Sequence, residues 1–145
     1  MSDAAAARSG SRTVARKLAL QALYRWQLNE CPWQDLVSEF ADAEDMGRAD
    51  VAYFRALISG VTASRTELDA ALAPLLDRAP DLLDPIEHAV LLLGAYELRH
   101  CPEVPFRVVI HEAVALAKRF GATEGFRYIN GVLDRGARQW RPDEH

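Results

Sequence analysis

The sequence predicts an all-α protein with about seven helices, arranged either in one domain or in two half-size bundles that share a core. Apolar residues recur at the three- to four-residue spacing of amphipathic helices along most of the 145 residues. No segment alternates apolar and polar residues between turn dipeptides, as a half-buried strand does. The one Asn-Gly pair, Asn130-Gly131, lies inside a helical pattern. Since 50% of the residues are hydrophobic, the chain can bury a core and is not predicted to be disordered.

The first two predicted helices lie near the N-terminus. One spans 13–29, where apolar residues return at helical spacing, and Pro32 ends it because proline lacks a backbone donor. A short amphipathic helix follows over 33–41. The residues ahead of the first helix are rich in alanine, serine, glycine and arginine, so we expect a flexible basic arm over 1–12.

Two more helices are predicted in the middle of the chain. The first is capped by Asp50 and continues to Val61, and the second begins at Ser64 or Thr66 and ends before Pro80. Aspartate, serine and threonine favour helix starts because their side-chain oxygen accepts a hydrogen bond from a free backbone N–H.

The last three predicted helices follow a strong start signal. Asp84 is a capping carboxylate followed by a proline. The helix that it opens, 86–100, is apolar almost all round, so it should be the most buried one. The next helix spans 107–120, and Thr123 caps a last one that reaches Trp140.

The pattern as a whole indicates one helical domain over 13–141. If it forms two half-size bundles, these sub-bundles span about 13–79 and 80–141. No apolar run approaches the roughly 18 residues that a membrane span needs. The N-terminal residues also lack the apolar core of a secretion signal. We therefore expect a cytoplasmic protein without membrane contact.

The charge is unevenly distributed along the chain. The net charge is −4, but residues 1–30 sum to +3, residues 31–105 to −9 and residues 106–145 to +2. A polyanion responds to the local patch, since charge interactions fade over about 8–10 Å in physiological salt. The two ends are therefore candidate RNA surfaces. The acidic middle is either a surface for a basic protein partner or a solvated face.

No catalytic or metal-binding motif is found in the sequence. His111-Glu112 begins like the zinc-protease pattern H-E-x-x-H, but Ala115 stands where the second histidine is needed. Cys31 and Cys101 lie far apart, so we predict neither a disulfide nor a metal site. We expect a protein that is not an enzyme and holds no cofactor.

Four segments carry a resemblance to a known family. Residues 15–28 contain A-L-Q-A-L-Y-R-W-Q, and residues 104–138 contain E-A-V-A-L-A-K-R-F-G followed by Y-I-N-G-V-L-D. Residues 50–61 and 86–98 fit the same family in order and spacing. The chain therefore resembles the NusB family over nearly its whole length. This resemblance implies two small helical bundles packed together and a role in transcription antitermination.

The resemblance also implies partners. These are boxA-type single-stranded RNA of ribosomal RNA leaders, a small-subunit ribosomal protein called NusE, and the RNA polymerase antitermination complex. The alternative is a protein-only adaptor that holds NusE while NusE reads the RNA, and a homodimer is left open. NusB-like domains also precede the catalytic domain of some RNA cytosine methyltransferases. The glycine-rich cofactor loop of such a domain is absent from this sequence.

The predicted RNA-binding residues lie near both ends of the chain. Arginine suits this role because it donates two hydrogen bonds to a phosphate and stacks on unpaired bases. The resemblance implies an N-terminal arm of Arg8, Arg12 and Arg16, with Lys17 and Gln21 one turn onward. The residues expected to extend this basic patch near the last two predicted helices are Lys118, Arg119, Arg127 and Tyr128. Tyr24 and Glu87 match positions at the partner surface.

Two residues of the last predicted helix, Tyr128 and Asn130, have more than one interpretation. Tyr128 is either a stacking platform for a base or a core residue, since aromatic residues at helical spacing usually pack inward. Asn130 either contacts RNA or satisfies a buried backbone group. The second role is favoured, because buried polar groups are normally hydrogen-bonded. Gly131 most simply permits a close helix approach.

Overall fold

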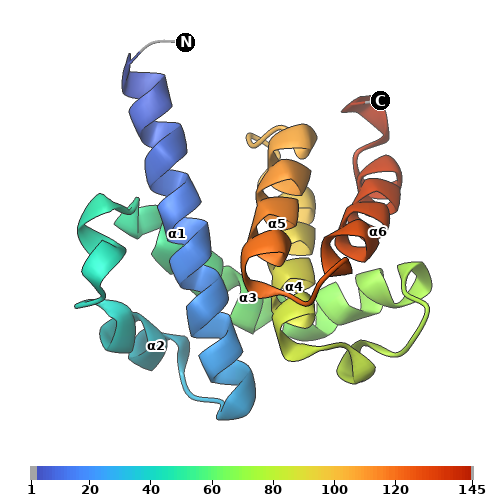
Figure 1. Cartoon of the computed structure of the whole chain (residues 1–145), viewed down its shortest axis with the longest axis horizontal. Helices are drawn as coiled ribbons and strands as arrows, with labels where there is room; N and C mark the ends of the chain where they lie inside the picture. The colour runs from blue at the N-terminus through green and yellow to red at the C-terminus, as the bar shows by residue number, and fades with distance from the viewer. Residues whose placement is uncertain (1–2, 145) are drawn as a thin grey trace. The chain divides into compact units, whose positions relative to one another are not determined.

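The computed structural model describes residues 3–144, and within this range the protein is all-helical (Figure 1). Four short 3-10 helices accompany the α-helices, and no strand is found among these residues. The predicted fold class is thus confirmed. The six α-helices are α1 (Asp3–Leu28), α2 (Trp33–Phe40), α3 (Val51–Leu72), α4 (Pro85–His100), α5 (Phe106–Phe120) and α6 (Gly125–Trp140).

Helix α3 accounts for the difference between seven predicted helices and six observed ones. The two helices predicted on either side of residue 63 form one continuous helix. The polar residues between them do not cap a new helix. The Thr62 hydroxyl instead donates to the backbone oxygen of Ile58, at 2.8 Å. A threonine that bonds back to the preceding turn can remain in a helix interior. The start predicted at Ser64 or Thr66 is wrong, because both residues lie inside the continuous α3.

Helix α1 begins earlier than predicted, at Asp3. The arm predicted over 1–12 is therefore helical from Asp3 onward, and its first two residues lie outside the described residues. The Ser11 hydroxyl donates to the backbone oxygen of Arg8 at 3.0 Å, as in a regular helical turn. The flexibility of this arm in solution stays a prediction.

The chain divides into two compact units, Met1–Ala63 and Ser64–His145. The boundary lies within α3 rather than near residue 79. In the first unit, α1 contacts α2 and the 3-10 helix Glu44–Arg48. Large apolar side chains such as Leu36 and Phe54 are fully buried.

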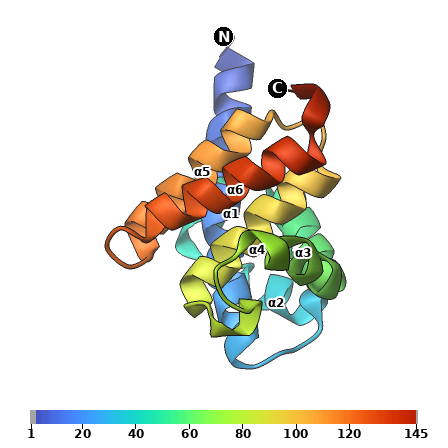
Figure 2. The same cartoon turned by 90° about the vertical axis from the view of Figure 1, so that its right-hand side faces the viewer.

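In the second unit, α4, α5 and α6 contact one another (Figure 2). Helix α4 is buried over most of its length, as its apolar sequence predicts. A Cβ on Gly94 would lie 2.7 Å from Leu133 Cδ1, so this glycine permits the close approach of α4 and α6. A Cβ on Gly131 would meet only Arg135, at 3.5 Å. The role predicted for Gly131 therefore belongs to Gly94.

The two helix starts predicted in this unit have different outcomes. The Asp84 carboxylate accepts hydrogen bonds from the backbone nitrogens of Ile86 (3.1 Å) and Glu87 (3.2 Å), which confirms the predicted cap of α4. The cap predicted at Thr123 is wrong. Helix α6 begins after Glu124, whose backbone is left-handed with φ 70°, and no side chain caps it. The chain thus enters α6 through a backbone turn instead of a side-chain cap.

The buried Arg141 side chain closes the C-terminal end of α4. Its guanidinium donates to the backbone oxygens of Glu97 (2.8 Å), Leu98 (2.8 Å), Cys101 (2.9 Å) and Val104 (2.5 Å). The last carbonyls of a helix have no partner within the helix. Arg141, located after α6, therefore supplies the donors that α4 and the following turn need.

Candidate nucleic-acid interface

In the first unit, two of the predicted basic residues of α1, Arg12 and Arg16, face the start of α3. The guanidinium carbon of Arg12 lies 4.3 Å from the centre of the Tyr53 ring, and that of Arg16 lies 5.4 Å from it. The Arg12 Nε also lies 3.6 Å from the Asp50 carboxylate. Arg12 is half-buried, whereas Arg16 is only 3% exposed. Arg16 thus faces protein, and Arg12 remains partly accessible.

The other predicted residues of α1 differ in accessibility. Arg8 and Gln21 are exposed. Lys17 is half-buried and forms an ion pair with Asp45. Of the predicted residues in this unit, Arg8, Gln21 and part of Arg12 are therefore available to a ligand.

A separate exposed stripe lies nearer the C-terminal end of α1. Gln21, Tyr24 and Leu28 are three and four residues apart, which places them on one side of the helix. Tyr24 is 36% exposed and Leu28 is 65% exposed. An exposed aromatic residue beside an exposed leucine is typical of a protein-binding surface.

In the second unit, basic side chains gather over aromatic rings where α5 ends and α6 begins. The Lys118 Nζ lies 4.8 Å from the centre of the Phe126 ring, and the Arg127 guanidinium carbon lies 5.5 Å from it. Arg119 lies over Phe120 at 4.9 Å. All three basic side chains are exposed, while both rings are half-buried. This end of the helical hairpin formed by α5 and α6 thus has positive charge beside partly accessible aromatic rings.

Tyr128 is held at its hydroxyl. It is half-buried, and the hydroxyl donates to an Asp77 carboxylate oxygen (3.0 Å) and accepts from the Asp77 backbone nitrogen (3.2 Å). The Arg78 guanidinium lies 5.3 Å from the ring centre. Hydrogen bonds from Arg78 and Tyr128 lower the pKa of Asp77 to about 2. Tyr128 is therefore fixed in place but is not a fully buried core residue.

Glu87 lies on the first turn of α4, close to the start of α6. Its carboxylate occupies the space where a side chain at Gly125 would stand. Burial, followed by the charge of Asp84, raises the pKa of Glu87. A half-buried carboxylate with a raised pKa gains from a basic or hydrogen-bonding partner, which suits its predicted place at a protein interface.

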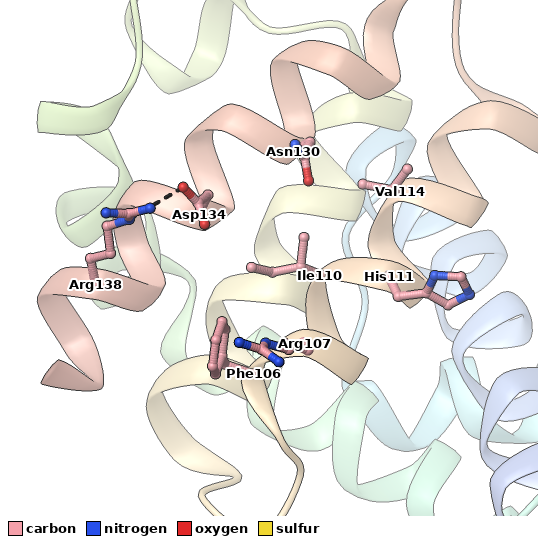
Figure 3. A pocket seen from close by; sticks show the side chains of 8 residues that line it. All are labelled: Phe106, Arg107, Ile110, His111, Val114, Asn130, Asp134 and Arg138. Carbon is pink, nitrogen blue, oxygen red and sulfur yellow. Dashed lines mark ion pairs between the residues drawn. The ribbon is translucent and has the colours of Figure 1, made fainter. Parts of the chain in front are cut away.

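A pocket of about 460 Å³ lies between α5 and α6 (Figure 3). Asp134 and Arg138, one turn apart on α6, form an ion pair at 3.3 Å along one side of it (Figure 3). Asn130 is exposed and lines the pocket, so the structural role favoured for it in the core is wrong. The neighbouring Ile129 is the buried residue, because successive residues of a helix point in different directions. The lining residues are Phe106, Arg107, Ile110, His111, Val114, Asn130, Asp134 and Arg138.

The sequence pattern alone does not predict this pocket. Arg107, His111 and Lys118 are four and seven residues apart, so they share one side of α5. That spacing could have indicated a stripe of basic side chains. The pocket itself requires α5 to lie against α6, and no local pattern shows this contact.

Neither a candidate metal site nor a candidate membrane span is found among residues 3–144. No group of three or more histidine, cysteine, aspartate or glutamate side chains there could hold a metal ion. None of the helices in this range is both long and apolar enough to cross a membrane.

Known proteins match this chain along most of its length. A family model described as the NusB family matches residues 13–138. The transcription antitermination protein NusB of Thiobacillus denitrificans is 49% identical over 136 residues, which cover 94% of each chain. The protein of the same name from Xanthomonas campestris pv. campestris (strain B100) is 50% identical over 133 residues, covering 92% of this chain and 84% of that protein.

Two solved structures have the same fold. T. maritima NusB matches with a TM-score of 0.81 and 27% identity, covering 92% of this chain and 94% of that one. A structure of the antitermination factors NusB and NusE in complex with dsRNA matches with a TM-score of 0.75 and 24% identity, covering 90% of this chain and 98% of the matched chain. At 24% identity, the similarity to this second structure shows only that the two chains share a fold.

Proposed function

Because this chain belongs to the NusB family, we propose that it is a transcription antitermination factor that binds boxA-type single-stranded RNA together with the ribosomal protein NusE. Its relatives at about half identity are transcription antitermination proteins. The observation that carries the RNA-binding part is the placement of Lys118 and Arg127 over the Phe126 ring. Cationic groups beside an aromatic ring can engage both the phosphates and the bases of a single strand.

The predicted residues of α1 divide into two roles in this proposal. Arg8, Arg12 and Gln21 contact the RNA, because they are exposed or half-exposed. Arg16 and Lys17 hold α1 in place through Tyr53 and Asp45. Direct phosphate contacts are therefore fewer than the number of basic residues suggests.

In the second unit, Lys118, Arg119 and Arg127 contact phosphates. Tyr128 presents its ring to a base while its hydroxyl remains bound to Asp77. Fixing the ring in advance lowers the conformational entropy that binding would otherwise cost.

NusE binds at Tyr24 and Glu87 in this proposal. Tyr24 is exposed beside Leu28. Glu87 is a half-buried carboxylate with a raised pKa. The acidic middle of the chain, which sums to −9 over residues 31–105, favours a basic partner. The complex acts on RNA polymerase in the cytoplasm and has no catalytic activity of its own. A homodimer that covers the RNA surface would be unable to bind RNA.

The test is fluorescence anisotropy of a labelled boxA-type RNA titrated with the protein, with and without NusE, at two salt concentrations. The double variant Arg8→Ala/Arg12→Ala should weaken binding and reduce the salt slope by about 1.4, since each phosphate contact on a single strand contributes roughly 0.7. Arg55→Ala is the matched control, because Arg55 is an exposed arginine on α3 outside the proposed surface.

The alternative function, a protein-only adaptor, predicts a different result. If NusE binds the RNA equally well without this chain, and the double variant behaves like Arg55→Ala, the RNA-binding proposal is wrong. Binding that depends on salt, increases with NusE and weakens in the double variant supports it.

A further inference from the structure

We propose that the pocket between α5 and α6 holds one unpaired nucleotide of the RNA, so that the RNA path in the second unit runs along the hairpin from Lys118 towards Arg107 and Arg138. This inference rests on the proposed function and extends it to residues that the family resemblance did not mark. The pocket volume of about 460 Å³ is within the range of small-ligand sites, roughly 300–1,000 Å³.

The lining of the pocket suits a nucleotide. Phe106, Ile110 and Val114 are its apolar residues, against which the faces of a base can pack. Asn130 projects from α6 towards α5 with an exposed amide, which can both donate to and accept from a base edge (Figure 3). An apolar surface combined with an exposed amide distinguishes a base site from a site for a simple anion.

The charged groups of the pocket favour a phosphate. Arg107 and Arg138 are cationic, and the single carboxylate in the lining, Asp134, is already paired with Arg138. Arg107 lies over the Phe106 ring, at 5.4 Å from its centre. A guanidinium over a ring keeps the N–H donors at its edge available for phosphate oxygens.

The pocket is also continuous with the proposed RNA surface. Val114 and the basic residues Arg107, His111 and Lys118 lie on one side of α5, at helical spacing. At 1.5 Å per residue, Arg107 and Lys118 are about 16 Å apart along the helix, a length that a few nucleotides can span. A strand bound at Lys118 and Arg127 can therefore reach the pocket without leaving the second unit.

An acidic protein segment would also be attracted to Arg107 and Arg138. It would, however, make no specific contact with the Asn130 amide or the apolar residues of the pocket. The observations favour RNA for that reason. Entry of a protein partner into the pocket is one of the outcomes that the test distinguishes.

The test compares two labelled single-stranded RNAs, a boxA-type segment and the same segment extended by several nucleotides at both ends. We expect Asn130→Ala and Arg107→Ala/Arg138→Ala each to weaken binding of the extended RNA, the double variant by about tenfold with a salt slope lower by about 1.4. Binding of the short RNA should change less than threefold. Gln139→Ala is the control for Asn130, because it is an exposed amide on another side of α6, and Arg55→Ala is the control for the arginines.

A direct measurement accompanies the titrations. Addition of the extended RNA to the unmodified protein should shift the NMR signals of the Asn130 side-chain amide and the methyl groups of Ile110 and Val114. The far-UV circular dichroism spectrum and the melting temperature of the pocket variants should be unchanged. The replaced side chains, those of Arg107, Asn130 and Arg138, are exposed.

Three results would overturn the inference. If the pocket variants bind the extended RNA like their controls while Arg8→Ala/Arg12→Ala loses binding, the pocket is not an RNA site although the proposed function stands. If the pocket variants weaken NusE binding and leave RNA binding unchanged, its occupant is a protein. If the unmodified protein binds neither RNA, with or without NusE, the proposed function fails as well.

Discussion

Replacing Arg141 by alanine should strongly destabilise the protein. The change removes the donors for four backbone oxygens, those of Glu97, Leu98, Cys101 and Val104. Arg141 is 7% exposed, so water has little access to these oxygens in the folded protein. Alanine would thus remove the donor from the buried Leu98 and Val104 oxygens. The Glu97 and Cys101 oxygens would each lose one of two donors, because they also accept from the backbone nitrogens of Cys101 and Val104, both at 3.0 Å.

The size of the effect can be estimated from these contacts. A hydrogen bond from a charged donor contributes about 1.5–3 kcal/mol. Simple addition over four bonds overestimates the loss, because ordering the long side chain costs entropy and water enters part of the space left by it. A buried, uncharged acceptor that loses its donor costs about 1–3 kcal/mol, so the Leu98 and Val104 oxygens together account for about 2–6 kcal/mol. We expect a loss in that range, against a total unfolding free energy of about 5–15 kcal/mol.

Arg141→Lys provides a graded comparison. A lysine ammonium has three donors in a compact group and cannot reproduce the planar guanidinium. It should recover about half of the lost free energy. Arg138→Ala is the matched control, since Arg138 is a neighbouring arginine whose side chain is 69% exposed and paired only with Asp134. Its effect should be within about 0.5 kcal/mol of zero.

Urea denaturation followed by far-UV circular dichroism measures these differences. The midpoint should fall in the order Arg138→Ala, Arg141→Lys, Arg141→Ala, with the denaturant slope unchanged. The reasoning is refuted if Arg141→Ala loses less than about 1 kcal/mol, because the four hydrogen bonds would then contribute no more than one ordinary bond.

Three further predictions follow from single contacts. Asp84→Ala should lower the unfolding free energy by about 1 kcal/mol in urea denaturation, since it removes the cap of α4. Tyr128→Phe should raise the pKa of Asp77 from about 2 towards 3.8, as measured by NMR titration of its carboxyl carbon. Because folding lowers this pKa, the stability from Asp77 is present above pH 3.8 and is lost as the pH falls towards 2. Arg16→Ala should lower the melting temperature, whereas Arg8→Ala should not, because only Arg16 is buried.

The sequence predicted the fold class because helical periodicity is a local property. The cap at Asp84 was predicted for the same reason, since the signal and its partners lie within three residues. Helix α3 was divided in error, because serine and threonine can either begin a helix or bond back within one. The cap at Thr123 failed because the turn before α6 depends on a backbone conformation at Glu124 that glutamate seldom adopts.

The candidate site was less predictable, because it depends on contacts distant in sequence. The resemblance marked Arg8 and Arg16 alike, yet only one is exposed. Their difference depends on Tyr53, which lies on another helix. The anchoring of Tyr128 by Asp77 joins residues 51 positions apart. No local pattern predicts either contact.

The contact between Arg141 and the end of α4 has a consequence for cooperativity. The residue that closes α4 is separated by 37 to 44 positions from the oxygens that it binds. Fraying at the C-terminal end of α6 therefore releases the last turn of α4 as well. These two segments should open together as one cooperative unit, and their backbone amides should show similar protection in native-state hydrogen exchange.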